Sequence, residues 1–346
     1  MLRNHAGAVR YSEMVQWVRG VLAEFTPHGT RCHVCPHGCV LSAGQVGVCK
    51  VRRGVAGGGL ETATFTSSVT HVDAVERKPF FHYRPGTQAV TLAAPGCSFR
   101  CDYCINFRIS QYGRDDQAGW DASPVDAADV VRRAARLGGA VALSYTEPSL
   151  APELTLALAR HGREAGVDVI WKSNGFLTAE AVALCAPAVA AVNIDVKTMD
   201  ERAHRTLTGA PMRPVLDAIR AFREHGTWVE VCTPLIPGVT DPEPIAAALA
   251  RISPDIPWHL LRFTPAYRMR DQDPTAPRAL AAAVEAGLAA GLRYVYVERA
   301  LGAAGRNTRC PSCHATVVRR GVWTLLENRI QAGRCPGCGE RLEGRW

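Results

Sequence analysis

Three cysteines of this chain have a spacing that can hold a metal cluster with one ligand missing. The stretch APGCSFRCDYCIN places Cys97, Cys101 and Cys104 in the order C-x3-C-x2-C, and the next cysteine is Cys185. A tetrahedral zinc site or a complete iron–sulfur cluster usually takes four protein ligands. The spacing therefore predicts a metal site whose last position is not filled by cysteine.

Two further cysteine groups flank this one. Two C-x2-C pairs near the carboxyl end are typical of a zinc ribbon, formed by Cys310, Cys313, Cys335 and Cys338. The group near the amino end has the less diagnostic spacing C-x2-C-x3-C-x9-C, formed by Cys32, Cys35, Cys39 and Cys49. Zinc and an auxiliary 4Fe–4S cluster both remain open there, with zinc slightly favoured. The two isolated cysteines, Cys185 and Cys232, lie in apolar surroundings, and we expect them to be buried.

The composition is that of a globular protein in a reducing compartment. Of 346 residues, 47% are hydrophobic and 21% charged, and eleven of the thirteen cysteines lie in clusters, which indicates metal rather than disulfides. The amino-terminal stretch lacks the order of a signal peptide, and no apolar run reaches about 18 residues. We therefore expect a cytoplasmic protein with no membrane partner. The net charge of +8 counts every cysteine as neutral, and metal-bound thiolates would lower it because they are anionic. Nucleic acid is therefore a possible partner, but the charge does not require one.

Short apolar runs alternate with helix-length segments between about residues 88 and 298, which predicts repeated βα units and a parallel sheet. The expected strands are 89–94, 140–146, 167–173, 191–197, 228–236 and 258–264, with a seventh run at 294–297. Ser123, Pro124 and Gly138 predict the start and end of one helix. Six units can close as a partial (β/α)6 barrel or form an open doubly wound sheet, and periodicity does not choose between them.

Polar residues follow most of these strands at the carboxyl end, where ligands bind in both folds. They are Cys97 after the first strand, Glu147 after the second, Asn174 after the third, Asp195 and Lys197 at the end of the fourth, and Thr264 at the end of the sixth. His259 is the exception because it lies near the start of its strand. The pattern predicts one site at one rim.

The cysteine trio, with Tyr103 just before its last member, resembles the signature of the radical S-adenosylmethionine (SAM) superfamily, whose barrel is a partial (β/α)6. In that family the trio binds three irons of a 4Fe–4S cluster, and the fourth iron binds the amino and carboxylate groups of SAM. The resemblance implies reductive cleavage of SAM to a 5′-deoxyadenosyl radical, which removes a hydrogen atom from a substrate.

Other motifs resemble SAM-binding elements of the pyruvate formate-lyase activating enzyme group. SYTEP (144–148) implies Glu147 as the ligand of the SAM amino group, although Tyr145 and Thr146 stand where glycines are common. SNG (173–175) and DVK (195–197) imply that Asn174, Asp195 and Lys197 line the SAM site. The alternative for the last two is a salt bridge that caps a strand. His259 resembles a late SAM contact, and we place Tyr103 among the cofactor-binding residues.

A closer resemblance covers residues 30 to 346. The ordered motifs CPHGC, VERKPFFHYRPG, GCSFRCDYCINFRISQ, SYTEP, NIDVK, RFTP and the terminal CPSC and CPGCGERLEG look like the AmmeMemoRadiSam system radical SAM enzyme, with Arg77 where a second Lys is usual. The resemblance implies a Memo-like protein and an AMMECR-type protein as partners, together with an electron donor such as flavodoxin or ferredoxin. In ERKPFFHYRPG, packing is favoured for Phe80 and Phe81, while Lys78 and His82 are weaker functional candidates.

We predict three parts: residues 1–60 as an amino-terminal helix and four-cysteine metal module, residues 61–300 as the radical SAM partial barrel, and residues 303–346 as a zinc ribbon. The substrate is not identified. One alternative is a glycine of a partner protein that the terminal modules dock. A second is a small molecule or a peptide, with the terminal modules closing the mouth of the barrel. RNA gripped by the ribbon and scattered arginines is the third alternative.

Overall fold

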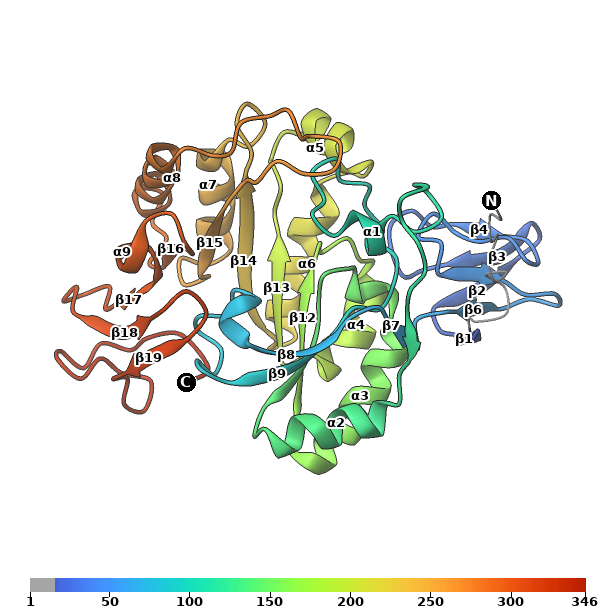
Figure 1. Ribbon diagram of the computed structural model, residues 1–346, viewed down its shortest axis with the longest axis horizontal. Coiled ribbons are helices and arrows are strands. Elements are labelled where there is room, and N and C mark those ends of the chain that lie inside the picture. Colours follow the sequence, from blue (N-terminus) through green and yellow to red (C-terminus); the bar gives the residue numbers. More distant parts are fainter. Residues whose placement is uncertain (1–15) are drawn as a thin grey trace, which may run out of the picture.

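A sheet of eight strands forms the centre of the computed structural model, which describes residues 16–346 (Figure 1). In spatial order the strands are β16 (Val295–Val297), β15 (Trp258–Arg262), β14 (Trp228–Leu235), β13 (Ala191–Asp195), β12 (Asp168–Ser173), β11 (Ala140–Leu143), β9 (Gln88–Leu92) and β8 (Thr70–Ala74). The seven predicted runs all form strands, and β9 and β11 to β16 are parallel. The antiparallel edge strand β8 was not predicted.

The strand order decides between the two predicted arrangements. Each parallel strand adds to the same side of the one before it, whereas a doubly wound sheet reverses direction at a switch point. Because all connections between neighbouring parallel strands are right-handed, the helices lie on one face of the sheet. The sheet curves away from them. The edge strands β8 and β16 do not pair with each other, so the barrel is partial. The predicted α/β fold, a partial (β/α)6 barrel, is confirmed.

Seven helices connect the strands and follow them along the chain: α2 (Ala127–Arg136), α3 (Pro152–Ala165), α4 (Ala179–Cys185), α5 (Glu201–Thr208), α6 (Arg213–Glu224), α7 (Pro242–Ile252) and α8 (Pro277–Ala289). The predicted start of α2 was wrong. Ser123 and Pro124 instead form β10, which pairs with β7 (Thr66–Ser67). Asp126 is the N-cap, because its carboxylate accepts hydrogen bonds from the first turn. Gly138, at φ +60°, lies just beyond the end as predicted.

The amino-terminal part from residue 16 consists of two small sheets at one end of the molecule (Figure 1). One contains β1 (Val18–Gly20), β6 (Leu60–Thr62) and β5 (Arg52–Gly54), and the other β2 (Ala23–Thr26), β3 (Gly29–Cys32) and β4 (Val40–Leu41). The described residues 16–60 contain strands and no helix. The rest of the predicted amino-terminal helix region, residues 1–15, lies outside the described residues.

The carboxyl-terminal ribbon lies at the other end of the molecule (Figure 1). It contains β17 (Thr308–Arg309), β18 (Thr316–Arg320) and β19 (Leu325–Asn328), and the short helix α9 (Gly302–Arg306) leads into it; α1 (Phe107–Ser110) follows the cysteine loop. The guanidinium of Arg320 is buried and donates to the carbonyl of Phe81 at 2.5 Å. No helix of residues 16–346 combines the length and apolar character needed to cross a bilayer.

The segment 75–86 crosses the barrel near the amino ends of its strands. Phe80 and Phe81 are fully buried, in keeping with the favoured packing interpretation. Glu230, the third residue of β14, accepts from the backbone N–H groups of Phe81 at 3.0 Å and His82 at 2.9 Å. Phe81 and His82 therefore pack near the amino ends of the strands. The site is expected at the opposite end, at the carboxyl ends of the strands.

Candidate functional site

The three central cysteines lie on the loop that follows β9 and line one cavity of about 290 Å³. Arg114 holds this loop: its guanidinium donates to the carbonyl oxygens of Cys97 and, at 2.9 Å, Phe99. Backbone hydrogen bonds further along the loop form turns, such as the bond from the Cys104 N–H to the Cys101 carbonyl at 3.2 Å. The loop thus directs three thiols into one space.

Polar groups lie beside two of these three buried sulfurs. The Sγ of Cys97 accepts from the Phe99 N–H at 3.4 Å and from Asn174 Nδ2 at 3.6 Å, and the Sγ of Cys104 lies 3.2 Å from the Ser110 hydroxyl. Burial raises the pKa of all three thiols, that of Cys97 to about 12. Burial therefore disfavours the thiolate forms, and a bound metal cluster would stabilise them.

Glu147 and Asn174 connect the ends of β11 and β12 to the cysteine loop. The buried carboxylate of Glu147 accepts from the Ser173 hydroxyl at 2.7 Å and from the Asn174 N–H at 2.7 Å. Burial raises its pKa, and these hydrogen bonds oppose the rise. Asn174 Nδ2 in turn donates to the Ser98 hydroxyl at 2.9 Å. Both predicted residues line the cavity, and Glu147 positions Asn174 beside the first cysteine.

Asp195 and Lys197 also line the cavity, together with Tyr103. The Asp195 carboxylate bonds to Lys197 Nζ at 2.5 Å and to Lys172 Nζ. Burial would raise the pKa of Asp195, but the two ammonium groups hold it below its usual range. The salt bridge considered from the sequence is therefore present, and it lies within the site. Lys197 Nζ is 5.6 Å from the centre of the Tyr103 ring.

Lys172 was missed by the sequence analysis. It is on β12, two residues before Asn174, and so shares its face of the strand. The sequence did offer a sign of its role: Lys172 lies inside the apolar run VDVIWKS, where a buried charge needs a partner of opposite charge.

The structure places His259 elsewhere. It is the second residue of β15, is fully enclosed and bonds through Nε2 to Glu230 at 2.6 Å. It does not line the cysteine cavity. The reason is its strand position: a residue near the amino end of a parallel strand lies far along the barrel from the carboxyl rim. Its expected SAM contact finds no support in this geometry.

Tyr145 is a second residue whose importance the sequence only hinted at. It has φ +68°, a left-handed conformation that glycine adopts readily and a bulky side chain rarely does. Its hydroxyl lies 3.0 Å from Lys78 Nζ and 3.2 Å from Asp73 Oδ2. Tyrosine thus occupies the glycine-like backbone position of SYTEP, and a buried charge cluster holds it at the cavity wall.

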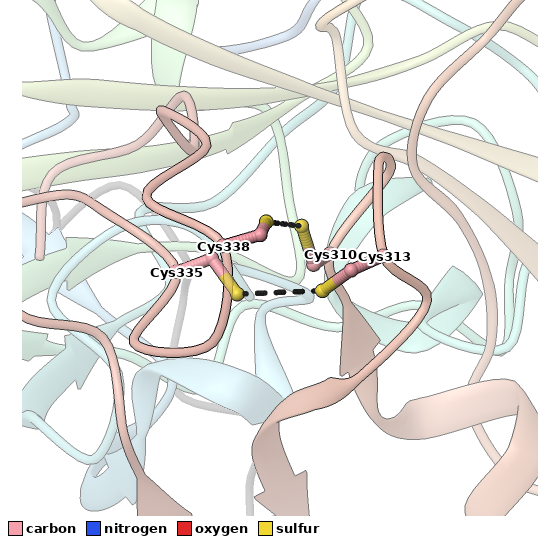
Figure 2. A group of neighbouring side chains, drawn as sticks. All are labelled: Cys310, Cys313, Cys335 and Cys338. Atoms are coloured by element: carbon pink, nitrogen blue, oxygen red, sulfur yellow. Dashed lines mark hydrogen bonds between the residues drawn. The ribbon is translucent and has the colours of Figure 1, made fainter.

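The two outer cysteine groups differ in geometry. In the carboxyl-terminal group the Sγ atoms of Cys310 and Cys338 are 3.6 Å apart and those of Cys313 and Cys335 are 3.7 Å apart (Figure 2). All four sulfurs lie within 4.8 Å of one another, a set that could hold one metal ion. The amino-terminal group, Cys32, Cys35, Cys39 and Cys49, surrounds a separate cavity. The isolated Cys185 and Cys232 are fully buried, as predicted.

The central residues fit a 4Fe–4S cluster with one iron left for SAM. Cys97, Cys101 and Cys104 supply three thiolates, and no fourth cysteine of the described residues lines their cavity. N–H groups already point at the Cys97 sulfur, a common feature of iron–sulfur ligands. The remaining wall carries the polar groups of Asn174 and the Asp195 pair, which are suited to a zwitterionic cofactor. Bound there, the cluster and SAM would supply one-electron cleavage of the sulfonium.

Comparison with known proteins agrees with this geometry. A family model described as the radical SAM superfamily matches residues 92–250. The uncharacterized protein MJ0808 of Methanocaldococcus jannaschii is 31% identical over 320 residues, which cover 90% of this chain and 95% of that protein. The isethionate sulfite-lyase activating enzyme of Nitratidesulfovibrio vulgaris is 32% identical over 148 residues, 40% of this chain and 48% of that enzyme.

Among solved structures, Streptococcus suis SuiB bound to S-adenosylmethionine matches with a TM-score of 0.49 and 13% identity, covering 68% of this chain and 56% of that one. The family model spans the cysteine loop and the strands that carry Glu147, Asn174 and Asp195. The chain therefore belongs to the radical SAM superfamily, as an enzyme related to those that activate glycyl-radical enzymes.

Proposed function

We propose that this enzyme removes a hydrogen atom from a glycine of a partner protein, by means of a 5′-deoxyadenosyl radical formed from SAM. The similarity to isethionate sulfite-lyase activating enzyme supports an activating role. The motif order described above further supports a place in the AmmeMemoRadiSam group. Memo-like and AMMECR-type proteins are then the first candidate partners, and flavodoxin or ferredoxin the candidate reductants.

The observation that carries the proposal is an open groove of about 840 Å³ beside the cysteine loop. Asp102 lines the groove, whereas its neighbours Cys101 and Tyr103 line the catalytic cavity, so one loop separates the two. Apolar side chains of Met199, Val239 and Met269 form part of the groove.

The mouth of the catalytic cavity is apolar as well. Ile105, next to Cys104, lines that cavity and is 72% exposed. An exposed apolar side chain at a cavity mouth, beside a groove that combines apolar with acidic side chains, suits contact with a macromolecule better than with a small solute.

Anaerobic reconstitution tests the proposal. The protein is given a reductant, SAM and a candidate partner whose glycines carry deuterium, and 5′-deoxyadenosine is analysed for deuterium. We expect partner-dependent cleavage of SAM, deuterium in the product and a carbon-centred radical signal from the partner. The Cys101→Ala variant should give none of these. Stimulation by small-molecule fractions, or by RNA with a steep salt dependence, in place of any protein would contradict the proposal.

A groove variant makes the test specific. Val239→Glu puts a charge into the apolar wall and should raise the partner concentration needed for half-maximal transfer at least about tenfold, which corresponds to about 1.4 kcal/mol. Leu288→Glu places the same charge on α8, where Leu288 is 52% exposed and outside the groove, and should leave that concentration unchanged. Equal effects of the two variants would exclude the groove as the docking site.

A further inference from the structure

The four amino-terminal cysteines surround one small enclosed cavity. Cys32 ends β3, Cys35 and Cys39 lie on the loop before β4, and Cys49 lies on the turn before β5. Apolar side chains complete the wall, namely Val34, Leu41, Val48 and Leu150. The centre of a water-sized sphere can occupy a volume of about 10 Å³ inside this cavity. The four cysteines thus line a small space, walled by apolar side chains, that holds about one such sphere.

A single zinc ion does not account for this spacing. Zinc binds sulfur at about 2.3 Å, which sets tetrahedral sulfurs about 3.8 Å apart and leaves no room for a water-sized sphere between them. The carboxyl-terminal cysteines meet that condition, since all their sulfurs lie within 4.8 Å of one another. Among residues 16–346 no other group of three or more ligand residues does so. The amino-terminal sulfurs, like those of the catalytic trio, are too widely spaced for one ion.

Arg52 provides an independent sign of an anionic, hydrogen-bond-accepting occupant. Its guanidinium is 1% exposed and lines the cavity. Nη1 bonds to Glu153 at 3.0 Å and Nη2 to the carbonyl of Val21 at 2.6 Å, but the buried Nε has no partner. A buried N–H without an acceptor destabilises the folded state. Sulfide or thiolate sulfur of a cluster would satisfy it.

The module packs directly on the catalytic loop. A side chain at Gly96 would meet the Cys49 carbonyl oxygen at 2.8 Å. Arg114, which holds the carbonyls of the catalytic loop, also donates to the Val48 carbonyl at 2.9 Å. His37, between two of the amino-terminal cysteines, bonds to the Ser98 carbonyl at 2.9 Å. An occupant of this cavity therefore lies one loop away from the catalytic cysteines.

We propose that Cys32, Cys35, Cys39 and Cys49 bind a second 4Fe–4S cluster with four thiolate ligands, in place of zinc. Four thiolates on four different irons are held further apart than four thiolates on one ion, which matches the spacing and the central space. The complete ligand set leaves no iron for SAM, so this cluster does not cleave it. The inference does not depend on the proposed function.

Metal analysis of a variant that keeps the module intact tests this. Cys97, Cys101 and Cys104 are all replaced by Ala, and the protein is reconstituted anaerobically with iron and sulfide in the presence of equimolar zinc. We expect about 4 irons and about 1 zinc per chain, with the Mössbauer spectrum of a 4Fe–4S cluster, against about 8 irons in the unmodified protein. About 2 zincs and no iron, or an amino-terminal module without metal, would overturn the proposal.

A second variant controls for folding. Adding Cys35→Ser to the triple variant should remove the remaining iron while the ribbon keeps its single zinc, which reports that the chain is folded. The unmodified protein should show two reduced-cluster signals by EPR, only one of which changes when SAM is added. If both signals respond to SAM, or if iron persists after Cys35→Ser, the assignment of the four ligands is wrong.

Discussion

Asp73 shows how one buried residue supports the catalytic wall. Its carboxylate bonds to Lys78 at 2.6 Å and to Arg77 at 3.0 Å, and it also contacts His71 and Tyr145. Burial would raise the pKa of Asp73, but the ammonium of Lys78 holds it below its usual range. Tyr145, in its left-handed conformation, is therefore held in place by a buried charge pair.

The two basic partners of Asp73 should differ in their effect on stability. The side chain of Lys78 is 2% exposed and that of Arg77 is 43% exposed. Lys78→Met removes the buried basic partner of the Asp73 carboxylate and leaves only the partly exposed His71 and Arg77, so it should lower the free energy of unfolding by about 3–5 kcal/mol. Arg77→Met, the matched control, should cost about 0–1 kcal/mol. Urea unfolding of the metal-loaded proteins measures both, and similar losses would show that burial does not govern this pair.

His82 predicts a loss of stability in acid. Burial lowers its pKa to about 4. Nδ1 faces the carbonyl of Glu343 at 2.7 Å, so it carries the proton, and Nε2 accepts from the Tyr296 hydroxyl at 2.6 Å. An unfolded histidine binds a proton near pH 6.5, so the folded state loses stability as the pH falls from about 6.5 to about 4, by up to about 3 kcal/mol.

Unfolding measured at several pH values checks this, with His82→Gln as the variant that cannot titrate. The difference in stability between pH 7 and pH 4 should be smaller in the variant by about that amount. An identical pH dependence would assign the acid sensitivity to other groups, such as the metal-bound thiolates.

The sequence predicted those site residues that lie at the carboxyl ends of strands, because these strand ends meet at one rim of the barrel. Cys97, Glu147, Asn174 and Asp195 follow or end consecutive parallel strands, and the fold brings them to one cavity. His259 could not be placed, because its distance from the rim depends on where β15 begins. Lys78 and Tyr145 meet only through tertiary packing, which no local pattern records.

At the scale of elements, the open side of the barrel is closed by the ribbon. Trp323, between β18 and β19, lies against two guanidinium groups: that of Arg77 after β8, at 4.7 Å from the ring centre, and that of Arg299 after β16, at 4.4 Å. Its indole N–H donates to Glu298. Arg77 and Glu298 both line the catalytic cavity. One tryptophan therefore joins the two unpaired edges of the sheet.

Replacing this tryptophan should loosen both edges. Trp323→Ala removes the contact shared by Arg77 and Glu298, so amide hydrogen exchange should accelerate at residues 75–79 and 296–299. Leu326→Ala, on β19 of the same ribbon, removes a side chain that is 61% exposed and should change neither segment. Mass spectrometry of the exchanged peptides measures this. Unchanged exchange in Trp323→Ala would show that the edges hold without the ribbon.

The elements themselves were mostly predictable because the parallel strands are buried on both faces and form continuous apolar runs. The edge strand β8 was not, because its sequence THVDA is short, polar and partly exposed. The helix start at Asp126 was missed because Ser123 and Pro124 carry the same local signal and are instead paired with β7. Ser123 and Asp126 are both suitable N-cap residues, and the pairing of β10 with β7 leaves Asp126 as the N-cap.

At the scale of the whole molecule, the ribbon behaves as part of the barrel more than as an attached module. The backbone of Arg84 donates to Arg345, and Arg345 donates at 2.7 Å to the carbonyl of His82. Phe81, Tyr294 and Tyr296 form a buried cluster beneath it. Metal binding in the ribbon and packing of the barrel base should therefore depend on each other.

A chain that ends at residue 302 should consequently fail to fold to a stable monomer. It exposes the aromatic cluster and leaves the carbonyl of Phe81 without the Arg320 guanidinium. We expect aggregation in size-exclusion chromatography and binding of a hydrophobic dye. The full-length Cys313→Ser/Cys338→Ser variant, which keeps the packing residues but loses the metal ligands, should remain soluble with a lower melting temperature.

Comparing the truncated chain with the cysteine variant separates the contribution of the ribbon's packing to stability from that of metal binding. A monomeric truncated chain with the melting temperature of the full protein would show that the barrel is independent of the ribbon. Equal aggregation of both variants would instead assign the ribbon's contribution to its metal. Because Arg320 and the backbone of Arg345 both bond to the barrel base and are both absent from the truncated chain, we expect the truncation to be the more severe change.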